Sequence, residues 1–98
     1  MTSISLRAAG ALAGVVLERH LQRAAENHGI VLKKKDPTTS DLNDPLKEKG
    51  VYGIPVWRKI QYLADIRNLC SHKNGADPSQ EQVSELIEGV NAIVKTVS

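Results

Sequence analysis

The chain has 98 residues, which is enough for one domain with a single hydrophobic core. Hydrophobic residues make up 41% of it and charged residues 24%, as is typical of a globular domain. The net charge of +2 is too small by itself to indicate nucleic-acid binding. The single cysteine, Cys70, excludes an internal disulfide and any site of paired thiolates, so we expect a cytoplasmic protein.

A long helix is predicted first, over residues 3–28, because apolar side chains recur along it with the helical period. Gly29 is suited to end it in the left-handed conformation. The apolar run 8–17 is far shorter than the roughly 20 residues that span a membrane. Charged residues follow it where a signal peptide has small ones, so we interpret it as a buried helix with no membrane role. His20 lies on the apolar face, where a hydrogen-bonded core histidine is expected.

Small residues in the first half of this helix would allow another helix to approach closely. They are Ala9, Gly10, Ala13 and Gly14. Because a glycine within a helix costs about 1 kcal/mol relative to alanine, close packing is the expected compensation.

A basic connection and a short second helix are predicted next. Lys33, Lys34 and Lys35 lie within residues 30–38, where they form either a solvated loop or a set of phosphate contacts. Thr38 or Thr39 is placed to cap a helix that ends at Gly50. Pro45 fits this helix poorly unless the helix begins late.

Two further helices complete the pattern. Pro55 suits the first turn of a third helix that extends to residue 72 or 73. Asp77-Pro78 should cap and begin the fourth, with Gln80 placed for a capping box. We therefore predict one all-α domain over residues 1–98, an up-and-down bundle of four principal helices.

The third helix carries one residue that does not fit its pattern. Arg67 falls near the middle of an apolar arc, and its charge cannot be removed at ordinary pH. Two interpretations remain open: an arginine at the edge of the core paired with a carboxylate such as Glu18, or a face that lines a functional cleft or a subunit interface. Beside the arc runs a polar stripe of Arg58, Gln61, Asp65, Asn68 and His72.

The segment from Arg67 to His72 resembles the signature of the HEPN superfamily, in which an arginine and a polar residue precede a histidine. Here Asn68 fills the polar position and four residues separate Arg67 from His72. The segments 19–21 and 40–44 are similar to parts of compact bacterial HEPN-like domains. Such domains are often appended to larger proteins, so whether the chain is a C-terminal module of a longer protein stays open.

The resemblance implies RNA cleavage without a metal or other cofactor, by attack of the 2′-hydroxyl on the adjacent phosphate. His72 would be the general acid or base, Arg67 would hold the phosphate, and Asn68 would orient the imidazole or contact the phosphate. Lys33, Lys34, Lys35 and Arg58 are the candidate RNA-binding residues. No Cys/His spacing in the chain suits a metal ion.

A homodimer is also expected, in which the third helix, with or without the first, forms the interface. Tyr62 and Leu69 are apolar and lie on the far side of the third helix from its main arc. Arg67 and His72 lie about 140° apart on a regular helix, so they converge only if the helix loosens near Ser71 or if two subunits supply them. The alternative function is a non-catalytic helical interaction module.

Overall fold

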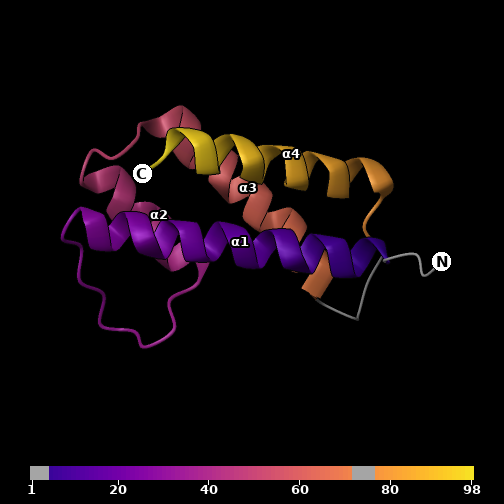
Figure 1. Ribbon diagram of the computed structural model, residues 1–98, viewed down its shortest axis with the longest axis horizontal. Helices are drawn as coiled ribbons and strands as arrows, with labels where there is room; N and C mark the ends of the chain where they lie inside the picture. The colour runs from indigo at the N-terminus through magenta and orange to yellow at the C-terminus, as the bar shows by residue number, and fades with distance from the viewer. Residues whose placement is uncertain (1–4, 72–76) are drawn as a thin grey trace.

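A computed structural model describes residues 5–71 and 77–98 of the chain. This part contains four α-helices and no strands. The prediction of an all-α bundle is confirmed (Figure 1). The helices are α1 Leu6–Asn27, α2 Thr39–Glu48, α3 Ile54–Ser71 and α4 Gln80–Thr96.

The ends of α1 follow from local chemistry. Ser5 caps its first turn by accepting a hydrogen bond from the Ala8 amide at 3.0 Å, so the helix begins slightly later than predicted. At the other end Gly29 has a φ of +69°, as the pattern predicted, and the chain leaves the helix there. Gln22 on α1 donates to the Pro37 carbonyl at 3.5 Å, which ties the connection after Gly29 back to the helix.

The second helix begins with a reciprocal cap. The Thr38 hydroxyl accepts from the Asp41 amide, and the Asp41 carboxylate accepts from the Thr38 amide at 2.9 Å. These hydrogen bonds, with a smaller contribution from Lys34, lower the pKa of Asp41. Pro45 lies inside the helix despite its missing amide hydrogen. Burial of Leu42 and Leu46 in the core offsets that loss.

The start of α4 differs from the prediction. Ser79 is the cap, and its hydroxyl accepts from the Gln82 amide at 3.1 Å. The Gln82 side chain in turn accepts from the Ser79 amide at 2.9 Å. The prediction of Asp77-Pro78 with Gln80 was therefore wrong by two residues, because Ser79 and Gln82 form the capping box. Asp77 forms an ion pair with Arg7 of α1.

The three long helices enclose the core. α1 and α4 run in the same direction, α3 runs in the opposite direction, and α2 packs against α1 and α3 (Figure 1). Fully buried side chains from all four helices meet there: Leu17, Leu21, Leu42, Leu46, Ile60, Leu63 and Leu86. No helix in the described part of the chain has the length and apolar character needed to cross a membrane.

A polar network buried between α2 and α3 fixes the junction of these two helices. The Asn43 amide donates to the Trp57 carbonyl at 3.0 Å and its side-chain oxygen accepts from the Tyr52 hydroxyl at 2.6 Å. Burial and the nearby carboxylate of Asp44 raise the pKa of Tyr52, so its hydroxyl stays a donor. Because these buried groups are satisfied, the network sets how α3 leaves α2.

The apolar run at residues 8–17 is buried on only one face of α1. The prediction of a buried helix is therefore wrong for the opposite, outer face of this segment. Leu17 is 1% exposed, but Leu12 is 62%, Val16 is 51% and Val15 is 41% exposed. In the part of the chain that the structure describes, no fourth long helix covers this outer face, and the short α2 lies on the α3 side of α1. An apolar surface of this kind therefore needs an explanation.

Candidate functional site

The end of α3 that carries the motif packs closely against α1. A Cβ atom placed on Gly10 would overlap the Sγ of Cys70 and lie 3.1 Å from its Cβ. A Cβ atom on Gly14 would overlap the Cγ of Arg67. The prediction that small residues of the first helix allow close approach is confirmed, and the helix they admit is α3.

Arg67 lies at the edge of this contact. Its aliphatic stem covers Gly14, and its side chain is 29% exposed. Its Nη2 lies 3.8 Å from a carboxylate oxygen of Glu18, whose side chain is 25% exposed. The Nε atom is buried and has no hydrogen-bond partner among residues 5–71 and 77–98. The ion pair with Glu18 that the first interpretation of Arg67 expects is therefore present. Its N–O distance is long, however, and part of the guanidinium is left without a hydrogen bond.

The polar stripe of α3 faces outward where the structure describes it. Arg58, Asp65 and Asn68 are exposed, and Gln61 is half-buried. His72, the third residue of the motif, lies outside the described residues. Asn68 follows Arg67 in the sequence, but its side chain lies on the solvent-exposed side of α3.

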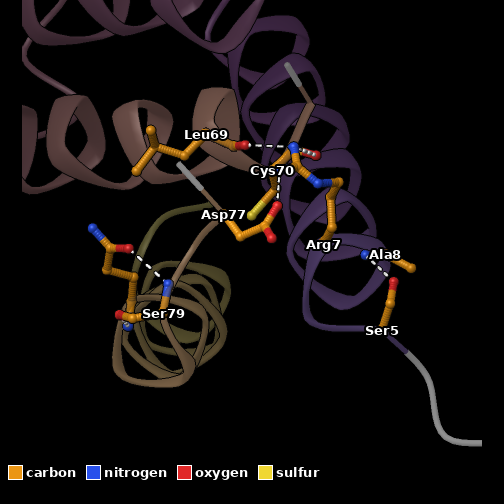
Figure 2. Close-up of polar contacts among 8 residues, drawn as sticks. Ser5, Arg7, Ala8, Leu69, Cys70, Asp77 and Ser79 are labelled. Atoms are coloured by element: carbon orange, nitrogen blue, oxygen red, sulfur yellow. Dashed lines mark hydrogen bonds and ion pairs between the residues drawn. The ribbon is translucent and has the colours of Figure 1, made fainter. Parts of the chain in front are cut away.

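Arg7 is the residue at this site that the sequence patterns missed. Its Nη1 donates to the carbonyl of Leu69 at 2.9 Å and to that of Cys70 at 3.3 Å. Its Nη2 lies 2.5 Å from the Asp77 carboxylate (Figure 2). The guanidinium thereby satisfies carbonyls in the last turn of α3 and holds Asp77, which lies shortly before the start of α4. A cation in the first turn of a helix opposes the helix dipole, which was the available signal that Arg7 has another role.

Replacing Arg7 by alanine is expected to lower the free energy of unfolding by about 1–2 kcal/mol, because two carbonyls at the end of α3 lose a charged donor. Amide hydrogen exchange should speed up selectively in the last turn of α3. Asp77→Ala is the matched control, since the Asp77 side chain is 90% exposed and contributes little. Equal effects of both substitutions would contradict the capping role.

The candidate RNA-binding lysines lie on the connection between α1 and α2. All three are exposed, and Lys34 forms an ion pair with Asp41 at 3.2 Å. Lys34 and Lys35 border a hollow of about 270 Å³ whose floor includes Ala25, Ile30 and Leu42. The fourth candidate, Arg58, belongs to α3 and does not line this hollow. One of the three charges is therefore locally neutralised.

The surroundings of Cys70 and His20 indicate that both side chains stabilise the fold. Burial raises the pKa of the Cys70 thiol, while Arg7 opposes that shift, so the group stays a protonated thiol packed on Gly10. The Nε2 of His20 hydrogen-bonds the Val97 carbonyl, which agrees with the predicted bonded histidine, although its side chain is only partly buried. Within residues 5–71 and 77–98, no cluster of three His, Cys, Asp or Glu side chains is arranged to hold a metal ion.

The arrangement has two chemical capacities. Arg67 offers a partly exposed cation with an unsatisfied donor, and the loop lysines offer exposed positive charge. Both are suited to an anionic ligand. Comparison of the chain with protein-family models, with curated proteins and with solved structures finds no match.

Proposed function

We propose that this chain is a HEPN-like RNA-binding domain of the cytoplasm that cleaves RNA as a homodimer without a metal ion. The observation that carries the proposal is the guanidinium of Arg67. It stays charged at any ordinary pH and its side chain is 29% exposed, yet among the described residues its ion pair with Glu18 is as long as 3.8 Å. A phosphate oxygen of bound RNA is a closer acceptor for the exposed part of this group, whereas the buried Nε stays out of reach of RNA.

The other motif residues take the roles that the resemblance implies. His72 acts as general acid or base when the 2′-hydroxyl attacks the adjacent phosphate, since an imidazole titrates near neutral pH. Asn68 contacts the same phosphate or orients the imidazole, and its exposed side chain is available for this. Lys33 and Lys35 extend the positive charge along the RNA, and Arg58 adds to it from α3.

The test is incubation of the pure protein with mixed RNA in EDTA, with His72→Ala and Arg67→Met as comparisons. The proposal expects cleavage that persists in EDTA and is lost in His72→Ala, while RNA affinity of that variant is retained. Products should carry 2′,3′-cyclic phosphate or 3′-phosphate ends, as attack by the 2′-hydroxyl requires. Cleavage that disappears in EDTA, or that is equal in the wild type and His72→Ala, would contradict it.

Simultaneous replacement of Lys33, Lys34 and Lys35 by alanine is expected to weaken RNA binding and reduce its salt dependence. For single-stranded RNA each lost phosphate contact lowers the slope of log affinity against log salt by about 0.7, so three contacts lower it by about 2. Because Asp41 already pairs with Lys34, a smaller reduction is expected in practice. Fluorescence anisotropy over a salt series measures it, with Lys95→Ala on α4 as the control. An unchanged slope would show that the three lysines of this loop contact solvent and not RNA.

The second candidate, a non-catalytic interaction module, has its own support. Glu18 places a carboxylate 3.8 Å from the Arg67 guanidinium, so it competes with a phosphate for this cation. The outer face of α1 also exposes large apolar side chains of the kind that protein partners cover. This function expects no RNA cleavage and no change of RNA affinity in Arg67 variants, which separates it from the first.

A further inference from the structure

Five exposed side chains form a stripe along the outer side of α3. We call this stripe the α3 seam and define it as Ile54, Arg58, Tyr62, Asp65 and Leu69. Successive members are three or four residues apart, so all five lie within about 80° of one another around the helix. These are the spacings at which one helix packs along the length of another. The three large apolar members are 39% to 53% exposed, so the described part of the chain leaves them only partly covered.

The other helices contact α3 away from this seam. Arg67, which packs on α1, is two residues and about 200° from Leu69. Leu63, which packs on α4, is likewise two residues and about 200° from Asp65. On another flank the indole of Trp57 donates to a carboxylate of α2 at 2.7 Å. The seam therefore lies on the side of α3 that faces away from the bundle.

The order of the side chains along the seam is symmetric. From the start of α3 they are the apolar Ile54, the positive Arg58, the ring of Tyr62, the negative Asp65 and the apolar Leu69. The point between residues 61 and 62 is equally far from the two charges and equally far from the two aliphatic side chains. Neither Arg58 nor Asp65 forms an ion pair within residues 5–71 and 77–98. The seam is thus complementary to a copy of itself that runs in the opposite direction.

We propose that the α3 seam binds a second copy of this chain, with the two α3 helices antiparallel about a two-fold axis between residues 61 and 62. This axis places Arg58 of each copy level with Asp65 of the other, so that two ion pairs form. It places Ile54 of each copy level with Leu69 of the other. A parallel pairing instead places each charge against its own kind, so charge selects the antiparallel arrangement.

The ring of Tyr62 lies next to the axis and is already held in place. Its hydroxyl donates to Glu85 of α4 in the same chain at 2.6 Å, while the side chain stays 49% exposed. The two rings therefore meet without loss of this hydrogen bond. Five side chains from each copy are far fewer than the roughly 20–30 residues of a standard interface, so a weak dimer is expected, with a Kd in the micromolar range or above.

This inference deepens the proposed function, on whose homodimer it rests, by assigning the orientation of the two copies. Because Arg67 lies on the opposite side of α3 from the seam, the arginines of the two motifs are separated by about 16 Å along the helices and share no cleft. One chain must then supply both Arg67 and His72, which requires that the helix loosens near Ser71. The inference also moves Arg58 from the RNA-binding residues to the dimer contact.

Light scattering over a concentration series into the high micromolar range tests the surface. The mass of the wild type is expected to rise towards twice the monomer mass, and Leu69→Glu should stay at the monomer mass throughout. Val16→Glu, at an exposed apolar position of α1, is the matched control and should behave as the wild type does. Circular dichroism checks that each variant is folded, and Ile54→Glu repeats the test if Leu69→Glu fails to fold.

Charge reversal tests the orientation. Arg58→Glu and Asp65→Arg should each weaken self-association about tenfold or more, because each places like charges opposite one another in the antiparallel pair only. An equal mixture of the two variants should restore the dimer, since both ion pairs then form with reversed or native sign.

Four results would overturn the proposal: a monomeric wild type, a dimer that survives Leu69→Glu, dissociation by Val16→Glu, or single reversals that leave the dimer unchanged. RNA binding is measured separately on the same samples. A monomer that binds RNA therefore overturns the seam alone, and a dimer without RNA affinity overturns the proposed function alone.

Discussion

Replacing Gly10 by alanine should lower the free energy of unfolding by about 2 kcal/mol. The new methyl group would overlap the Cys70 Sγ, and it would lie 3.1 Å from the Cys70 Cβ, which is fixed to the α3 backbone. Overpacking of a core contact costs about 1–3 kcal/mol or more, whereas the gain in helix propensity is about 1 kcal/mol. Chemical denaturation with an unchanged dependence on denaturant concentration is the measurement.

The matched test is a double-mutant cycle with Cys70→Ala. Removing the sulfur abolishes the overlap with Sγ and leaves only the 3.1 Å contact with the Cβ of residue 70, so Gly10→Ala should cost less in that background. The coupling energy between the two substitutions is expected to exceed about 1 kcal/mol. Since this contact sets how closely α3 lies on α1, Gly10→Ala should also reduce RNA binding through a shifted Arg67. A stabilised Gly10→Ala protein would show that the helices are not in contact there.

Two substitutions of Arg67 should separate its stem from its charge. Arg67→Ala is expected to lower the free energy of unfolding by about 1–2 kcal/mol, because the stem that covers Gly14 is lost. Arg67→Met keeps most of that stem and removes the buried, unbonded Nε, so stability should hold or rise. Both should reduce RNA affinity at least tenfold, since a hydrogen bond to a charged group contributes about 1.5–3 kcal/mol. Thermal melts and anisotropy measure the two effects.

Glu18→Gln is the control that distinguishes the two functions. It keeps the shape of the side chain and removes the negative charge beside Arg67. If Arg67 binds a phosphate, loss of the competing carboxylate should raise RNA affinity, while stability changes by no more than about 1 kcal/mol for this partly exposed pair. If Arg67 only anchors α1 to α3, Glu18→Gln and Arg67→Met should both destabilise the protein and leave RNA affinity unchanged.

The sequence by itself determined the elements. Four helices were predicted from hydrophobic period and from cap residues. Gly29, Gly50 and Thr38, one of the two caps that the pattern allowed, lie at the boundaries where local chemistry placed them. These features depend on neighbouring residues only: a hydroxyl that reaches an amide three residues on, or a glycine that enters the left-handed region. The close approach at Gly10 and Gly14 was also readable, because glycine within a helix is costly unless something packs on it.

Only the tertiary structure decided which residues meet across the bundle. Asp77 looked like a helix cap, and only the structure shows that its partner is Arg7, far away in sequence. The cap itself, Ser79 with Gln82, is a local pattern that the prediction passed over. The periodicity of α1 could not reveal that its outer apolar side is left uncovered, because α2 is short and packs on the other side. Arg67 was recognised as anomalous from its position alone, but its loose contact with Glu18 depends on how α1 and α3 cross. Local patterns determine elements and their ends, whereas long-range pairing depends on how those elements pack.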